Sequence, residues 1–189
     1  SVFPEVRKNF IGGAKNHDIQ PMKPTFIVIM GVSGCGKSTI AKHLATKING
    51  MFLEGDAFHP PENKAKMGAG IPLQDTDRWP WFDRLIHAAN AILETDSSPV
   101  LACSALKQAY RDYLFRNFSS HRLIYLQGSF DLIKSRMDAR EHEYMTSDLL
   151  RSQFAILEEP TPGPDQLILS IELYPDEIIA AISVWLEQT

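Results

Sequence analysis

The segment of residues 31–38, which reads G-V-S-G-C-G-K-S, constrains the fold more than any other feature of the sequence. It follows an apolar run at residues 26–30 that is typical of a buried strand, and it precedes a segment whose apolar residues have helical spacing. Between a strand and a helix, the pattern G-x-x-x-x-G-K-[ST] predicts a loop whose backbone N–H groups surround phosphate oxygens. The alternative is a glycine-rich turn with a chance Lys-Ser pair, which the flanking strand and helix disfavour.

Individual residues of this phosphate loop have separate expected contacts. We expect Lys37 to reach the β- and γ-phosphates of ATP and the Ser38 hydroxyl to bind Mg²⁺, so ATP and Mg²⁺ are the predicted cofactors. Cys35 lies at a helix N-terminus, a position that lowers the pKa of a thiol, so we expect it to be alkylated unless ATP protects it. The residues expected to bind the nucleotide are Gly31, Val32, Ser33, Gly34, Cys35, Gly36, Lys37, Ser38 and Thr39.

Composition and charge indicate a soluble single-domain protein. The 189 residues are 44% hydrophobic and carry a net charge of −4, so no overall positive field would attract nucleic acid or an anionic membrane. No apolar stretch approaches the ~18 residues of a membrane span, and the two cysteines lack metal-ligand spacing, which fits a reduced, cytoplasmic setting. We expect residues 1–24 to form a partly ordered or disordered extension and residues 25–189 to form one domain.

Apolar runs alternate with helical patterns along the rest of the chain. Strands are predicted at residues 26–30, 51–53, 100–103, 123–126 and 167–171. Helices are predicted at residues 39–48, 61–67, 80–94, 107–117, 130–140, 147–158 and 176–187. This alternation predicts an α/β fold in which helices cover both faces of a parallel sheet. Ligands bind such sheets beyond the carboxyl ends of the strands, where the polar motifs of this sequence gather.

An aspartate and a histidine follow the second predicted strand. Asp56 lies at the sheet edge that faces the phosphate loop, where a carboxylate can accept a hydroxyl proton or orient a Mg²⁺-bound water. The alternative is that Asp56 only caps the helix that follows, but its place beside the loop favours the chemical role. Among the histidines, His59, in the same motif, is the candidate site residue.

Basic residues near the same edge are candidates for binding an anion. Lys107 and Arg111 follow the third strand and are four residues apart, so a helix beginning at residue 107 would place both on one face. Arg78 lies in an expected loop before a long helix, next to two tryptophans. The alternatives are a solvated helix face for the first pair and core packing for Trp79 and Trp81.

A second basic pair follows the fourth predicted strand. Arg136 and Arg140 flank the apolar face of a predicted helix, and a short polar segment separates this helix from the next. That outline predicts a flap at about residues 137–147, with arginines at its base that close over the nucleotide phosphates. For Arg140 the alternative is a favourable interaction with the helix C-terminus, worth less than about 1 kcal/mol.

These motifs together resemble those of the gluconokinases, a family of small P-loop kinases that phosphorylate D-gluconate with ATP. The resemblance runs from about residue 25 to the C-terminus and is most specific in residues 54–81 and 103–112. It is carried by Met30 with the loop, Glu54-Gly55-Asp56, His59-Pro60, Asn63, Lys66-Met67, Gly70-Ile71-Pro72-Leu73, Asp75, Asp77-Arg78, Pro80-Trp81, Cys103-Ser104-Ala105-Leu106-Lys107, Tyr110-Arg111-Asp112, Ser152-Gln153-Phe154 and Leu157-Glu158.

The resemblance implies a nucleoside-monophosphate-kinase-like, three-layer fold with a five-stranded parallel sheet in the order 2-3-1-4-5 and a lid. It implies transfer of the γ-phosphoryl group of ATP to the 6-hydroxyl of gluconate, giving 6-phosphogluconate, by a homodimer. Mapped onto this chain, it assigns catalysis to Lys37, Asp56 and Arg136, and nucleotide contacts also to Arg140. It assigns the substrate to Asp56, His59, Arg78, Lys107 and Arg111.

One segment departs from the family pattern, in which a histidine and an aromatic residue follow a basic-glycine pair in the lid. Here the matching positions read Glu141-His142-Glu143-Tyr144, so the histidine comes one residue early and its role is in doubt. The alternative functions are another small-molecule kinase of this fold, of shikimate or nucleotide type, and a nucleotide-binding regulator without transfer activity. The sequence does not decide between ATP and GTP.

Overall fold

A five-stranded parallel sheet forms the centre of the fold. The computed structural model describes residues 23–139 and 147–188. The strands are β1 (Phe26–Met30), β2 (Met51–Glu54), β3 (Pro99–Ala102), β4 (His121–Gln127) and β5 (Gln166–Ser170). They pair in the order β2-β3-β1-β4-β5, and each pair is parallel. The predicted strands and the predicted order 2-3-1-4-5 are therefore confirmed.

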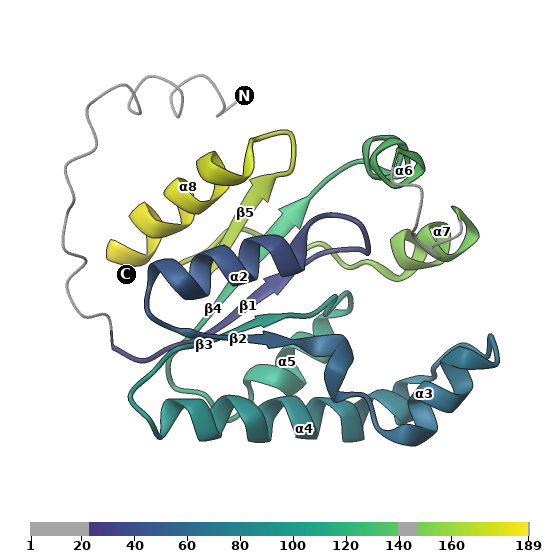
Figure 1. The fold of residues 1–189 in the computed structure, drawn as a ribbon, viewed down its shortest axis with the longest axis horizontal. Coiled ribbons are helices and arrows are strands. Elements are labelled where there is room, and N and C mark those ends of the chain that lie inside the picture. The colour runs from purple at the N-terminus through teal and green to yellow at the C-terminus, as the bar shows by residue number, and fades with distance from the viewer. Residues whose placement is uncertain (1–22, 140–146, 189) are drawn as a thin grey trace.

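Helices cover both faces of this sheet, as predicted (Figure 1). The helices are α2 (Lys37–Lys47), α3 (Pro61–Gly68), α4 (Asp75–Leu93), α5 (Gln108–Phe115), α6 (Phe130–Asp138), α7 (Ser147–Ile156) and α8 (Pro175–Glu187), with a short 3₁₀ helix, η1 (Gly55–Phe58). Helices α2 and α8 lie on one face, and α4 and α5 lie on the other. Helices α3, α6 and α7 lie toward the end of the sheet to which the strand arrows point.

Alternate residues of the strands face two separate apolar cores. On β1, which is fully buried, Ile27 and Ile29 pack in the core beneath α2 and α8, whereas Phe26, Val28 and Met30 pack in the core against α4 and α5. A strand buried on both faces needs a continuous apolar run, which is why the sequence pattern located β1 so well. The two cores hold the carboxyl ends of the strands in fixed positions.

Each predicted helix is shifted by at least one residue at one or both ends, and the shifts at the starts of α4 and α5 concern the predicted substrate residues. Helix α4 begins at Asp75 rather than at residue 80, because Gln74 and Asp77 form a capping box that starts the helix ahead of Pro80. Helix α5 begins at Gln108, so Lys107 is the extended residue before the helix and not its first member. The 3₁₀ turn η1 was not expected.

The division into an extension and one domain stays a prediction. Residues 1–22 and most of the predicted flap, residues 140–146, lie outside the described residues. Across residues 23–139 and 147–188, no helix is both long and apolar enough to span a bilayer.

Candidate active site

The phosphate loop joins β1 to α2 and contains backbone conformations that favour glycine. Gly34 has φ +80° and Gly36 has φ +97°, both in the left-handed region that other residues rarely adopt. A Cβ atom at Gly34 would lie 2.9 Å from Cγ of Met137, so α6 packs directly against the loop there. The loop is therefore shaped by its own glycines and by a neighbouring helix.

The side chains of Lys37 and Ser38 lie at the start of α2 and contact oxygen atoms. Lys37 Nζ donates to the carbonyl oxygen of Val32 at 2.9 Å, across the loop. Ser38 Oγ donates to Oε2 of Glu54 at 2.6 Å, which joins the loop to the carboxyl end of β2. No role was predicted for Glu54, although its place two residues before Asp56, at a strand end, was a signal for one.

The prediction that Cys35 has a lowered thiol pKa is wrong. The pKa of Cys35 is raised, because burial outweighs the lowering effects of the Lys37 charge and of nearby backbone N–H groups. The side chain is only 4% exposed, since it packs beneath the loop near Gly31. A buried thiol with a raised pKa is inert, so the structure also argues against the expected alkylation of Cys35.

Asp56 lies on η1, directly beyond β2, and its side chain is exposed. Trp81 of α4 supports this turn, because its Nε1 donates to the carbonyl oxygen of Gly55 at 2.8 Å. Burial raises the pKa of Cys103 to about 12, and the charges of Lys37, Asp56 and Glu54 also act on this thiol, Lys37 in the opposite direction. Glu54 pairs with Ala102, the last residue of β3, so Lys37, Glu54 and Asp56 all lie at the edge where β1, β2 and β3 end.

His59 is buried beside this turn. Its ring stacks on Trp81 with 4.0 Å between centroids, and its Nδ1 lies 3.3 Å from Nδ2 of Asn63. Burial lowers the pKa of His59, the charge of Asp56 raises it, and the cations Arg78 and Lys64 lower it. The imidazole is held by packing, and its contact with a substrate stays a prediction.

The carboxylate of Asp75 brings Arg78 and Lys107 together. Lys107 Nζ lies 3.1 Å and 3.2 Å from the two carboxylate oxygens of Asp75, and Arg78 Nη1 lies 3.5 Å from one of them. The Tyr110 hydroxyl also donates to Asp75, and this bond, followed by those from Lys107, lowers the pKa of the aspartate. Arg78 Nη1 donates as well to Leu73 O at 2.8 Å. Two of the predicted substrate cations thus lie side by side on different elements.

Arg111 does not share a face with Lys107. The residue is 2% exposed, and its guanidinium donates to the carbonyl oxygens of Ala105, Leu106 and Glu158, at 2.8–3.1 Å. These bonds fix the turn that carries Lys107. Lys107 belongs to this turn and not to the helix, since α5 begins one residue later than the pattern predicted. The predicted contact between Arg111 and the substrate stays a prediction, and the burial of its guanidinium argues against it.

One of the two predicted flap arginines, Arg136, lies in the last turn of α6. Arg136 Nη2 donates to the carbonyl oxygen of Ile171 at 2.7 Å, just after β5, and its neighbour Met137 contacts the phosphate loop at Gly34. Arg136 is therefore close to the loop in the fold, but its contact with a nucleotide is untested. Arg140 lies outside the described residues.

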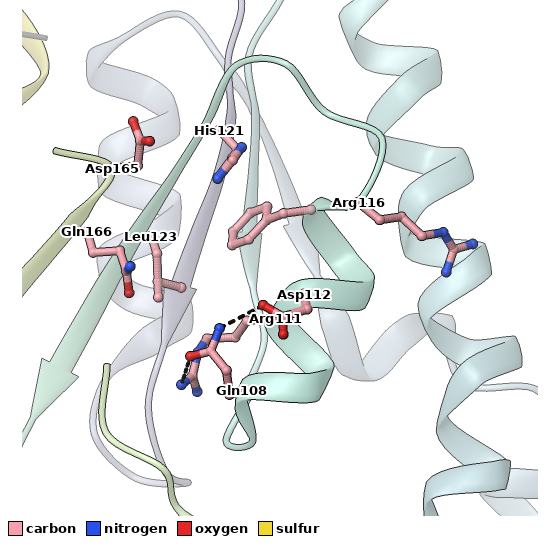
Figure 2. A pocket seen from close by; sticks show the side chains of 9 residues that line it. Gln108, Arg111, Asp112, Arg116, His121, Leu123, Asp165 and Gln166 are labelled. Atoms are coloured by element: carbon pink, nitrogen blue, oxygen red, sulfur yellow. Dashed lines mark hydrogen bonds between the residues drawn. The ribbon is translucent and has the colours of Figure 1, made fainter. Parts of the chain in front are cut away.

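A hollow of about 330 Å³ lies beside α5, apart from the phosphate loop and Asp56. Figure 2 shows it between α5 and the first residues of β4 and β5, where His121 and Gln166 begin their strands. Of the predicted site residues it includes Arg111, which bonds there to Gln108 Oε1 at 2.8 Å. The phosphate loop, Asp56 and Lys107 do not line it.

Comparisons with known proteins agree with this fold and identify the family. The shikimate kinase family matches residues 33–158. The thermoresistant gluconokinase of Escherichia coli is 41% identical over 82% of this chain and 89% of its own length. A gluconokinase crystal structure from Sinorhizobium meliloti, 37% identical, superposes with a TM-score of 0.78 over 88% of this chain and 94% of that one.

A probable gluconokinase of Mus musculus is 39% identical over 84% of this chain and 96% of its own length. Identities near 40% over nearly the whole length of these relatives go beyond a shared fold. They confirm the resemblance that the motifs indicated. Since the shikimate kinase family model also matches the chain, these small kinases share a common pattern. The chain belongs to the gluconokinase family.

Proposed function

We propose that the protein transfers the γ-phosphoryl group of ATP to the 6-hydroxyl of D-gluconate, giving 6-phospho-D-gluconate and ADP. The observation that carries this proposal is the hydrogen bond from Ser38 to Glu54, which joins the phosphate loop to the end of β2, directly before the turn that carries Asp56. A phosphate-binding lysine and an exposed carboxylate at the same edge of the sheet are what transfer to a hydroxyl requires. The gluconokinase names of the relatives supply the identity of the acceptor.

In this proposal residues 31–39 bind the ATP phosphates, and Lys37 moves from Val32 O to the β- and γ-phosphates. Phosphoryl transfer spreads negative charge over the phosphate oxygens, so a cation held at that place stabilises the transition state. Arg136 would add positive charge from the side of α6, and the nucleotide contact of Arg140, which lies outside the described residues, stays a prediction. ATP is the proposed nucleotide, in line with the relatives' activity.

Ser38 and Glu54 fit a Mg²⁺ ion. Their hydroxyl and carboxylate are oxygen ligands 2.6 Å apart, and Mg²⁺ prefers a few oxygen ligands together with substrate phosphates and water. In the described part of the chain, no group of three or more histidine, cysteine or acidic side chains is arranged to hold a metal. Ser38 would bind the ion directly and Glu54 directly or through water, and the bound ion would neutralise phosphate charge.

Asp56 would face the substrate hydroxyl and accept its proton late in the transfer. Lys107 and Arg78 would bind the gluconate carboxylate. Together with Asp75 they make a cluster of two cations and one anion, whose net charge of about +1 suits a monoanionic acid. His59 and Arg111 would complete the predicted substrate set, mainly by holding their neighbours in place.

The acceptor is tested by a coupled assay of ADP release with gluconate, shikimate and a nucleoside monophosphate at equal concentrations. Gluconate should stimulate ADP release far above the other two. A preference for shikimate or for the nucleotide would replace the proposed substrate with one of the alternatives, and no release with any acceptor would favour a regulator. Omission of Mg²⁺ should abolish the activity. We also propose that the protein is a cytoplasmic homodimer. Gel filtration with light scattering tests the oligomeric state.

A further inference from the structure

Gln153 of α7 makes two hydrogen bonds to one residue of the phosphate loop. Its Oε1 accepts from the backbone N–H of Ser33 at 2.7 Å, and its Nε2 donates to Ser33 Oγ at 2.9 Å. A backbone N–H can only donate, so the amide oxygen must face it and the amide nitrogen must face the hydroxyl. The two residues are 120 positions apart in the sequence, and a single side-chain amide joins them.

The helix that carries Gln153 is held firmly against the domain. Leu150, one turn earlier, is fully buried in the core beneath α2 and α8. The Phe154 ring packs edge to face on Phe130 of α6, with 5.8 Å between centroids. These contacts fix the backbone on both sides of Gln153, so its amide is a fixed support and not a mobile surface group.

The chain after α7 is tied to the turn that carries Lys107. The Glu158 N–H donates to Leu106 O at 2.9 Å, and Glu158 Oε2 accepts from the Gln108 N–H at 2.6 Å. Arg111 Nη2 donates to Glu158 O at 2.8 Å. Residues 153–158 therefore contact the phosphate loop at one end and the Lys107 turn at the other.

We propose that Gln153 is a positioning residue for ATP, which acts through Ser33. Ser33 lies between two glycines of the loop, in a segment without helix or sheet bonds to fix its conformation. By holding both polar groups of Ser33, the amide keeps the loop in the shape that receives phosphates, which reduces the ordering that ATP must otherwise impose. The loss of this support should weaken ATP binding and leave gluconate binding unchanged.

The inference rests on the proposed assignment of residues 31–39 to ATP. Its test is steady-state kinetics of the full chain, with ATP and gluconate varied separately, for Gln153→Leu, Ser33→Ala and the double variant. Gln153→Leu should raise the KM for ATP roughly tenfold, because two hydrogen bonds of modest strength are lost, and should leave the KM for gluconate within about twofold. The double variant should resemble Gln153→Leu, since the two residues form one unit.

Ser152→Ala is the matched control. Its hydroxyl bonds to Leu149 O at 2.6 Å within α7, and the KM for ATP should stay at the wild-type value. If Gln153→Leu unfolds, Gln153→Asn keeps an amide that is too short to reach Ser33 and is expected to show the same selective rise.

An unchanged KM for ATP, or an equal rise in both KM values, would overturn the role of Gln153. So would additive effects of the two substitutions. Failure of the wild-type chain to bind ATP would instead contradict the proposed function, so the two failures are distinguishable. A lower melting temperature with both KM values unchanged would make Gln153 a structural residue only.

Discussion

At the scale of single residues, the cations of the site are already held by oxygen atoms of the protein. Lys37 contacts Val32 O, Lys107 contacts Asp75, and Arg136 contacts Ile171 O. When an anionic substrate binds, its oxygen atoms would replace these protein oxygens as hydrogen-bond acceptors. The cationic side chains would therefore need little new ordering. The sequence located these cations but not their partners, because spacing along a chain does not give the direction of a long side chain. The burial of Arg111 and of Cys35 escaped prediction for the same reason.

The first prediction concerns Asp56. Asp56→Asn keeps the shape of the side chain but cannot take a proton, so turnover should fall by at least about a hundredfold. ATP binding should change little, because the loop holds the nucleotide. Asp83→Asn, an exposed aspartate of α4, is the control and should retain wild-type turnover. Lower ATP affinity with intact saturated turnover would make Asp56 a metal-binding or structural residue.

The second prediction concerns the pH dependence of stability. The pKa of His59 is lowered in the fold, so between that value and the unfolded value of about 6.5 the unfolded chain binds more protons. The contribution of neutral His59 is present above about pH 6.5 and is lost as the pH falls through the folded pKa. The melting temperature should therefore drop more between pH 7.5 and pH 5.5 (roughly one unit either side of that value) in the wild type than in His59→Gln.

His43→Gln is the control for this experiment, since His43 is exposed on α2. It should follow the wild-type pH dependence. An identical acid-induced drop in His59→Gln and in the wild type would exclude His59 as its source.

At the scale of elements, β1 and β3 were predicted well because a strand buried on both faces must be continuously apolar. The predicted start of α4 at residue 80 was wrong, because the capping box of Gln74 and Asp77 begins the helix at Asp75. That longer helix places Asp75 next to Lys107, so the error in the boundary and the missed ion pair have one cause.

The third prediction tests how α4 supports the turn that carries Asp56. Trp81→Phe keeps most of the buried ring but leaves the Gly55 carbonyl without its donor, which should cost about 1–3 kcal/mol of unfolding free energy. Urea denaturation measures this loss. Trp79→Phe, whose ring packs on Tyr113, is the control and should cost less. Equal losses in the two variants would mean that ring size, and not the hydrogen bond, matters.

At the scale of the whole molecule, the parallel sheet places the ends of β1, β2 and β3 side by side. This arrangement brings the phosphate loop, Asp56 and the Lys107 turn to one edge although they are far apart in the sequence. The strand order was predicted from the family resemblance. The edge that holds the site was predicted from the general rule that ligands bind parallel sheets beyond the carboxyl ends of the strands. Recognition of a carboxylate at that edge is the central claim of the proposed function.

The most direct measurement of this claim is the ratio of kcat/KM for gluconate to that for glucose, a sugar with a 6-hydroxyl and no carboxylate. Because Lys107 and Arg78 would bind the carboxylate, gluconate should be preferred by at least about a hundredfold, which corresponds to one charge-assisted contact. Lys107→Met should reduce this preference mainly by lowering kcat/KM for gluconate. Equal phosphorylation of glucose and gluconate by the wild-type protein would contradict the account.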